Sequence, residues 1–208
     1  MGRSERRRAR DEPGFLLQWD RCRYRYVEGE WGAPAAGLEL EGEERRRVPA
    51  LLLDRELRVK SRIGIDLEPV AVTSDEGALL LKSFVWADRR ERLDRLDRAV
   101  ALVRKNPPEI VRGDFLELLP DLLRTRRETP TIVLQVAAAG YLSAEGWERL
   151  HATLEAAGRD QPLAYVFAGK PGDGSHYYWG LWLTTWPDGS RTQLAHADFH
   201  GAWLDWLA

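Results

Sequence analysis

Two carboxylates follow predicted strands at the places where an open α/β sheet binds its ligands. Asp66 closes the apolar run RIGID (62–66), and Asp114 follows the run EIVRG (109–113). Ligands of open α/β sheets bind beyond the carboxyl ends of the strands, where a carboxylate can accept hydrogen bonds from ribose hydroxyls or an adenine amino group. The same two acids could instead cap the helices that follow or pair with one of the many arginines. The residues alone leave both interpretations open.

Three other groups of residues do not support a reactive site. His196, Asp198 and His200 alternate along a predicted strand, which would set the two histidines about 13 Å apart, too far for one metal ion. The glycine-rich segment 169–174 lacks the spacing of a phosphate-binding loop. Cys22 has no base partner nearby in the sequence. The sequence therefore predicts no metal site and identifies no catalytic residue.

The elements that position the two acids alternate between strands and helices. Apolar, β-branched runs predict strands near residues 63–66, 109–112, 131–136 and 163–167. Ser74 and Ser143 each have the position of a helix N-cap, and Asn106-Pro107-Pro108 ends a third helix. Strands and helices in alternation favour right-handed crossovers and therefore a parallel sheet.

The last part of the chain breaks this alternation. Two strand-like runs, 178–186 and 192–197, flank the turn Pro187-Asp188-Gly189-Ser190. An Asp-Gly pair between such runs is typical of an antiparallel hairpin. The sequence therefore predicts an α/β fold with a doubly wound parallel sheet and a C-terminal antiparallel hairpin.

Composition restricts the class of protein. The 208 residues suffice for one domain with a hydrophobic core. Apolar residues make up 44%, charged residues 31%, and the net charge of −2 argues against a protein that coats nucleic acid. No apolar run approaches the roughly 18 to 20 residues of a membrane span, and the single cysteine suits a reducing compartment. We therefore expect a cytoplasmic protein that binds neither nucleic acid nor membranes.

Four segments of the chain carry a family resemblance, and they occur in order from about Gly14 to the end. They are GFLLQWDRCRYRY (14–26), IGIDLEPVAVTSDEGALLLKSFVWADRRERLDRL (63–96), VRGDFLELLP (111–120) and ADFHGAWLDW (197–206). The patterns D-L-x-P-V and F-V-W-x-D within them are specific. On these segments the chain resembles an uncharacterised bacterial family, domain of unknown function 2332.

The order of elements in that family is similar to the Rossmann-like fold of S-adenosylmethionine-dependent methyltransferases. The resemblance implies a three-layer parallel sheet with a C-terminal antiparallel hairpin and S-adenosylmethionine as the cofactor. It implies that Asp66 holds the ribose and that Asp114 and Phe115 lie near the adenine. It also implies that Gln135 faces the methyl-transfer site, and that Gly14 belongs to the loop around the methionine moiety.

The chain departs from the family pattern in two places. Only residues 14–17 remain of a small-residue loop of the type G-A-S-A-G-L-N-L, so the first strand and most of that loop are missing. The fourth strand ends in Gln135-Val136, where relatives commonly have His-Ser. We therefore predict a disordered, arginine-rich leader over 1–12 and a single methyltransferase-like domain over 13–208, truncated at its N-terminus relative to the family.

Two functions compete on this basis, and the question of whether the chain is an enzyme stays open. The resemblance favours an S-adenosylmethionine-dependent methyltransferase with a small-molecule ligand. The missing loop favours a non-catalytic remnant or protein-interaction module that keeps the sheet but not the cofactor site. The missing strand also predicts an uncovered sheet edge beside residues 63–66. Residues 15–26 or a second copy, in a homodimer, would fill that edge.

Overall fold

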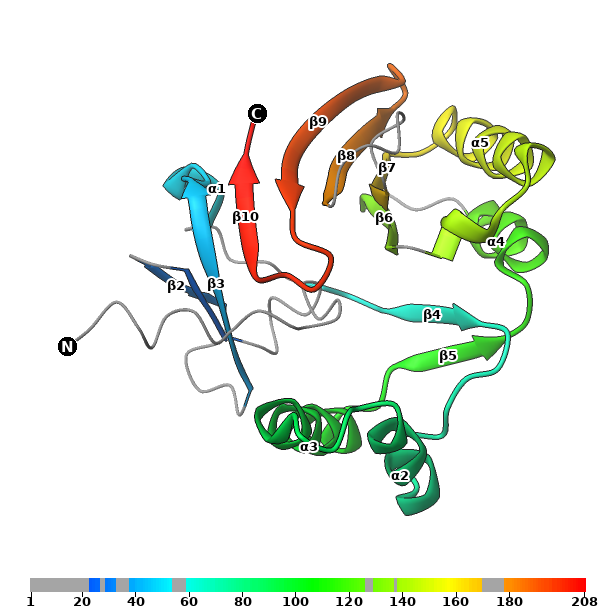
Figure 1. Cartoon of the computed structure of the whole chain (residues 1–208). Coiled ribbons are helices and arrows are strands. Elements are labelled where there is room, and N and C mark those ends of the chain that lie inside the picture. The colour runs from blue at the N-terminus through cyan, green and yellow to red at the C-terminus, as the bar shows by residue number, and fades with distance from the viewer. Residues whose placement is uncertain are drawn as a thin grey trace. The chain divides into compact units, whose positions relative to one another are not determined.

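The computed structural model describes residues 23–26, 29–32, 38–53, 59–125, 129–136, 138–169 and 178–208 (Figure 1). The chain divides into two compact units. The first unit comprises Met1–Glu43, Val48–Gly113 and His200–Ala202. The second unit comprises Glu44–Arg47, Asp114–Phe199 and Trp203–Ala208.

The described part of the first unit contains three strands of one sheet, a separate strand pair, a short helix and two longer helices that pack on each other. Strand β1 pairs antiparallel with β2 and parallel with β3, and β4 pairs parallel with β5. The elements of this unit are β1 (Arg23–Tyr26), β2 (Gly29–Gly32), β3 (Glu39–Arg46, whose last three residues belong to the second unit), α1 (Ala50–Leu53), β4 (Ile63–Asp66), α2 (Asp75–Ser83), α3 (Arg90–Lys105) and β5 (Glu109–Arg112).

Helix α2 begins where the sequence predicts it. The hydroxyl of Ser74 accepts a hydrogen bond of 3.0 Å from the backbone N–H of Gly77, which satisfies one of the free donors at the helix start. Gly77 is buried, and a Cβ at this position would overlap the carbonyl oxygen of Ala71. Glycine therefore lets the first turn of α2 pack directly on the preceding backbone.

The second unit is built on a curved sheet with the strand order β3-β10-β9-β8-β7-β6 (Figure 1). Strands β6 and β7 pair in parallel, while β7 with β8, β8 with β9 and β9 with β10 are antiparallel. The elements of this unit are α4 (Phe115–Arg124), β6 (Thr131–Val136), the 3-10 helix η2 (Ala138–Tyr141), α5 (Ala144–Gly158), β7 (Leu163–Gly169), β8 (Trp179–Trp186), β9 (Ser190–Ala197) and β10 (Trp203–Trp206).

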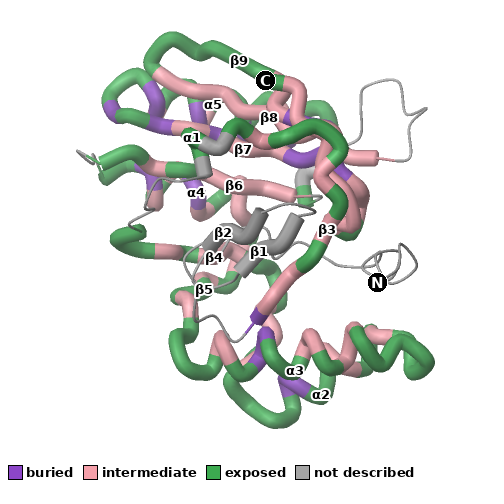
Figure 2. Tube along the Cα trace, turned by 90° about the vertical axis from the view of Figure 1, so that its left-hand side faces the viewer, coloured by how far each residue is buried: buried purple, intermediate pink, exposed green. Residues whose placement is uncertain are grey.

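The core of the second unit lies between α5 and the sheet. Leu150 and Leu154 are one helical turn apart on α5 and are 2% and 0% exposed, and Leu163 of β7 is equally buried. Figure 2 shows these buried stretches of α5 and β7 in purple. Close approach of α5 to β8 requires Gly158, where a Cβ would overlap the ring of Trp186. The i, i+4 spacing of the two leucines gives α5 one apolar face, and the sheet covers it.

The predicted fold class is wrong. The four predicted parallel strands exist, but β4 and β5 form their own two-stranded sheet, and the larger sheet is mostly antiparallel rather than a three-layer Rossmann-like parallel sheet. Alternation of strands and helices along a sequence sets the order of elements but not which strands pair. The hairpin of β8 and β9 and the additional strand β10 extend β7 with antiparallel neighbours, and these outnumber the parallel pair.

The expectation of an uncovered edge beside residues 63–66 concerns β4. Within the described residues, β4 pairs with β5 alone. Of the segment 15–26 that was expected to fill this edge, the described part is β1, which pairs with β2 and β3 instead. The predicted leader over 1–12 lies outside the described residues, and the single domain over 13–208 stays a prediction.

Candidate functional site

Asp66 closes strand β4 and organises the turn that follows it. One carboxylate oxygen accepts a hydrogen bond of 2.9 Å from the backbone N–H of Glu68. The backbone carbonyl of Asp66 accepts another, also 2.9 Å, from the N–H of Gly113. An acid that bonds its own backbone two residues later stabilises a turn. This turn is the local role of Asp66 in the structure.

Asp114 is the N-cap of helix α4. Its Oδ1 accepts a hydrogen bond of 2.8 Å from the backbone N–H of Leu116, and its backbone is extended, as in helix caps generally. Phe115 is the first residue of the helix and is half-buried. Helix capping, one of the two roles that the sequence left open for Asp114, is therefore observed.

Gln135 lies on β6, the last strand in the order of the second unit's sheet, where it pairs with Phe167 of β7. Its Oε1 accepts a hydrogen bond of 2.9 Å from the hydroxyl of Tyr165, a residue of β7 that is 3% exposed. Burial raises the pKa of Tyr165, so the hydroxyl keeps its proton and remains a donor. Gly14 lies outside the described residues. Asp114 and Phe115 are adjacent at the start of α4, whereas Gln135 lies on β6. The cofactor-binding role of Gly14, Asp66, Asp114, Phe115 and Gln135 stays a prediction.

A different part of the first unit stands out by its exposed apolar side chains. Helix α2 turns Gly77 and Ala78 inward, which leaves positions 76, 79, 80 and 83 on the opposite side. Residues spaced by three and four share one face of a helix. Leu79 and Leu80 on this outer face are 69% and 48% exposed. The outer face of α2 therefore combines Glu76 and Ser83 with two exposed leucines, whereas a helix that borders water usually has a polar outer face.

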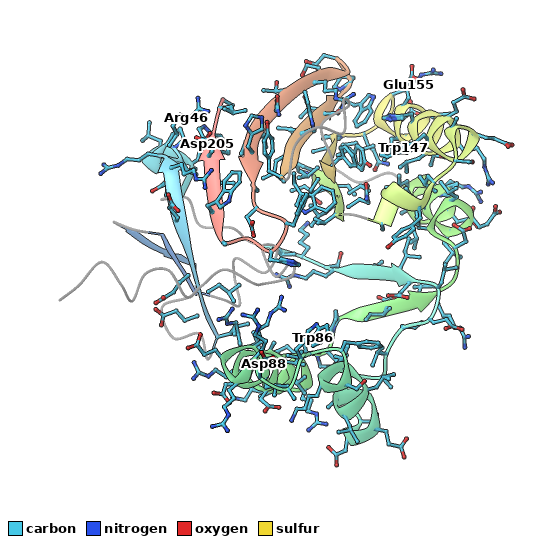
Figure 3. All side chains as sticks on the ribbon, viewed as in Figure 1. Arg46, Trp86, Asp88, Trp147, Glu155 and Asp205 are labelled. Carbon is cyan, nitrogen blue, oxygen red and sulfur yellow. The ribbon has the colours of Figure 1, made fainter. Side chains whose placement is uncertain are left out.

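Two exposed aromatic residues follow helix α2 in the chain. Phe84, whose backbone N–H caps α2 by bonding to the carbonyl of Leu81, is 71% exposed. Trp86 is 77% exposed and lies where the chain passes from α2 to α3 (Figure 3). We call the set Leu79, Leu80, Phe84 and Trp86 the α2 surface.

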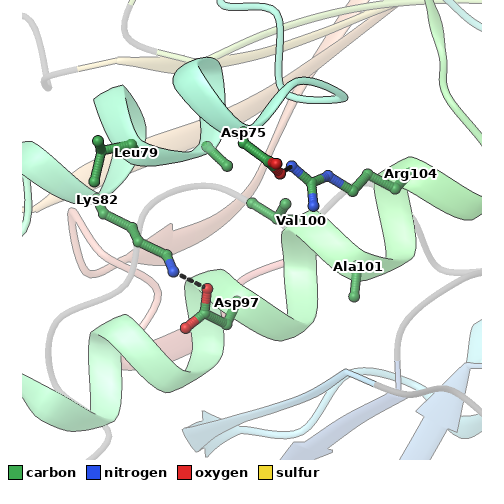
Figure 4. A pocket seen from close by; sticks show the side chains of 8 residues that line it. Asp75, Leu79, Lys82, Asp97, Val100, Ala101 and Arg104 are labelled. Carbon is green, nitrogen blue, oxygen red and sulfur yellow. Dashed lines mark hydrogen bonds and ion pairs between the residues drawn. The ribbon is translucent and has the colours of Figure 1, made fainter.

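A groove separates α2 from α3 and borders the α2 surface (Figure 4). Its volume is about 610 Å³, and it is lined by Asp75, Ala78, Leu79, Lys82, Asp97, Val100, Ala101 and Arg104. Ala78 and Val100 are buried at its base. Leu79 belongs to both the groove and the α2 surface, so the two features are continuous.

Two ion pairs cross this α2–α3 groove. Arg104 Nη2 lies 2.8 Å from Asp75 Oδ1, and Lys82 Nζ lies 2.5 Å from Asp97 Oδ1. Figure 4 shows one pair toward each end of the groove, with apolar side chains between them. An apolar centre within a polar rim is the usual arrangement of a protein interface.

The second unit contains a charged cluster of a different kind. Arg46 of β3 donates two hydrogen bonds, of 2.6 and 2.8 Å, to the two carboxylate oxygens of Asp205 on β10 (Figure 3). The guanidinium of Arg45 lies 3.7 Å from the ring centroid of Trp203. The hydrogen bond from Arg46 lowers the pKa of Asp205 and raises that of Arg46. These contacts are made within the unit itself and join two neighbouring strands.

The residues of the α2 surface were missed as functional candidates at the sequence level. Phe84 and Trp86 lie in the segment FVWAD (84–88), which in the sequence indicates the family but no function. The run ALLL (78–81) places apolar residues on both faces of the predicted helix, and this was the available signal.

Comparison with known proteins places the chain in a family. No curated protein and no solved structure matches it. None of the helices described is long and apolar enough to cross a membrane. The family described as "Uncharacterized protein conserved in bacteria (DUF2332)" matches residues 13–206, nearly the whole chain. The chain therefore belongs to the bacterial family of uncharacterized proteins designated DUF2332.

Proposed function

We propose that this chain is a protein-interaction module and that the α2 surface is where its partner binds. One observation carries the proposal: four large apolar side chains lie within eight residues and are between 48% and 77% exposed. Single exposed apolar residues are common on protein surfaces, but a concentration of large ones in one short segment is typical of an interaction site.

The energetics of burial support this function. A large apolar side chain gains roughly 1.5–3 kcal/mol when it is fully buried rather than exposed. Phe84 and Trp86 have most of their surface in water and therefore retain most of this gain for an association. Aromatic residues are also enriched among the few residues that dominate binding energy at interfaces. The groove beside them supplies a concave surface with a buried apolar base.

Photo-crosslinking tests the proposed function. The residue p-benzoyl-phenylalanine would replace Phe84, and in a matched control it would replace Tyr141, which is 93% exposed but lies in the second unit. In the producing bacterium we expect discrete crosslinked products from position 84 that Leu80→Asp abolishes, and none of comparable yield from position 141. Equal yields at both positions, or products that persist with Leu80→Asp, would contradict the proposal.

Methyl transfer with S-adenosylmethionine is a second candidate, and one observation favours it. Asp66 lies at the carboxyl end of β4, which pairs in parallel with β5, and this is the end of a parallel strand at which open α/β sheets bind their ligands. Against it, Asp66 and Asp114 already accept hydrogen bonds from their own backbone. Each further hydrogen bond to a ligand adds only about 0.5–1.5 kcal/mol, less than the cost of fixing a flexible ligand.

Calorimetric titration decides between the two candidates. We expect S-adenosylmethionine and S-adenosylhomocysteine to bind this chain weakly or not at all. A dissociation constant in the low micromolar range that Asp66→Ala weakens would restore the methyltransferase function.

A further inference from the structure

We propose that the partner bound by the α2 surface is a second copy of this chain. In this dimer, Phe84 and Trp86 of each copy occupy the α2–α3 groove of the other. The inference rests on the function proposed above and names the partner.

The first reason is that one unit carries both halves of a complementary contact. Phe84 and Trp86 are exposed just after the end of α2, and the groove runs along the same helix from Asp75 to Lys82. In an interface with two-fold symmetry, residue i of one copy contacts residue j of the other, and j contacts i in return. A protruding group and a groove on one continuous surface are what such a reciprocal contact requires.

The second reason is size. The groove measures about 610 Å³, within the range of roughly 300–1,000 Å³ that holds compact organic ligands, so it can accommodate aromatic side chains. An aromatic side chain buries on the order of 150–250 Å². Two aromatic residues inserted in each direction, with the groove walls they cover, bury on the order of 1,000 Å², which reaches the lower limit of a specific interface.

The third reason is charge. Helix α2 has Asp75 and Glu76 in its first turn and Lys82 in its last. Antiparallel packing of two α2 helices about a two-fold axis therefore sets the acidic start of each beside the basic end of the other. Asp75 and Lys82 are already neutralised by α3. Two copies can thus approach without opposed like charges at the groove.

Two substitutions separate the two halves of the contact. Trp86→Ser removes the projecting group but leaves the groove, and Ala101→Arg fills the groove but leaves the aromatic residues. Trp86 is 77% exposed and Ala101 is an exposed helical position, so neither change removes core packing. Circular dichroism of each variant checks its fold, and Tyr141→Ser is the matched control, because it removes an exposed aromatic ring outside the α2 surface.

Sedimentation velocity and light scattering of the purified full chain provide the test. With increasing concentration we expect the mass to rise from 23.8 kDa toward twice that value. Trp86→Ser and Ala101→Arg should each raise the dissociation constant at least about tenfold, as expected for central interface residues, while Tyr141→Ser should leave it unchanged. A mixture of the two variants should associate more strongly than either alone, because one of the two reciprocal contacts is intact.

Three results would overturn the inference: a monomer at all concentrations, a dimer that neither substitution weakens, or a mixture no stronger than its components. The crosslinking experiment distinguishes this failure from failure of the proposed function. Products from position 84 with a mass other than twice that of the chain would overturn the second-copy inference alone. A crosslink confined to one chain, or no product specific to position 84, would overturn both.

Discussion

Helices α2 and α5 have the same kind of N-cap, but their leucines lie in different environments. Each follows a serine whose hydroxyl accepts a hydrogen bond from a glycine N–H three residues later, at 3.0 Å for Ser74 and 3.2 Å for Ser143. Helix α5 buries its leucine pair completely against the sheet of the second unit. Helix α2 leaves Leu79 and Leu80 exposed. The same local signal therefore starts both helices, whereas the surrounding structure decides which leucines are covered.

This difference in burial means that the leucines of the two helices contribute to different properties, folding stability in α5 and binding in α2. The apolar residues of α5 contribute to the folded state of the second unit, because they are already out of water. Those on the outer face of α2 contribute little to folding and remain available for a partner. Substitutions at matched positions in the two helices should therefore affect different measurements.

The largest expected difference is between Leu154→Ala on α5 and Leu79→Ala on α2. Leu154 is 0% exposed, so its truncation leaves a cavity and should lower the free energy of unfolding by about 2–5 kcal/mol. Leu79 is 69% exposed, so its truncation should change that free energy by less than about 0.5 kcal/mol. Urea denaturation followed by circular dichroism measures both. Equal losses would show that α2 has no free face and would remove the basis of the comparison.

Local signals in the sequence predicted the elements well. The strands expected near 63–66, 109–112, 131–136 and 163–167 are β4, β5, β6 and β7, and the Asp188-Gly189 turn joins β8 to β9. The serine caps at positions 74 and 143 are confirmed. These features depend on residues close together in the chain, such as a cap and the N–H it accepts from.

Long-range pairing was not predictable in the same way. The alternating pattern indicated one parallel sheet, yet β10 pairs with β9 and the strand order of the second unit is mostly antiparallel. Burial depends equally on distant residues, so a local pattern alone does not establish that Leu154 is covered while Leu79 is exposed. For Asp114, helix capping was one of the alternatives expected from the sequence, and the hydrogen bond from the backbone N–H of Leu116 to Asp114 Oδ1 shows that this residue caps α4.

Glycine-to-alanine substitutions compare how tightly the two helices are held. A Cβ at position 77 would overlap the backbone carbonyl of Ala71, and one at position 158 would overlap the side chain of Trp186. We expect both variants to lose about 1–3 kcal/mol of unfolding free energy through overpacking, with the larger loss at position 77, since a backbone carbonyl cannot rotate away. Thermal and urea unfolding measure the loss.

Gly140→Ala is the control for this pair, because nothing lies within 4 Å of a Cβ at that position. Its unfolding free energy should stay within about 0.5 kcal/mol of the parent. Alanine is the better helix former by about 1 kcal/mol. Stabilisation at position 77 would therefore mean that helix propensity outweighs packing and that α2 is loosely held on both faces.

A smaller effect is expected at the start of α4. Asp114→Ala removes the oxygen that accepts from the N–H of Leu116 and should cost about 1 kcal/mol of stability. Asp114→Asn and Asp114→Ser retain an acceptor and should restore most of this loss, as measured by urea denaturation. If Asn and Ser were as destabilising as Ala, the carboxylate charge itself would matter, and a role beyond capping would follow.

The smallest expected effect is the pH dependence of the contact between Arg46 and Asp205. The hydrogen bond from Arg46 lowers the pKa of Asp205 below its ordinary value, so the unfolded chain binds this proton more readily than the folded chain. The contact therefore stabilises the fold above the unfolded pKa of about 4, and the stabilisation is lost as the pH falls through the lower folded value. The side chain of Arg46 is 59% exposed, so water and salt weaken the attraction. Melting temperatures of the parent chain and Asp205→Asn should differ slightly at pH 7 and low salt, and converge in acid or high salt. A difference that grows on acidification would show that Asp205 stabilises the sheet in its protonated form instead.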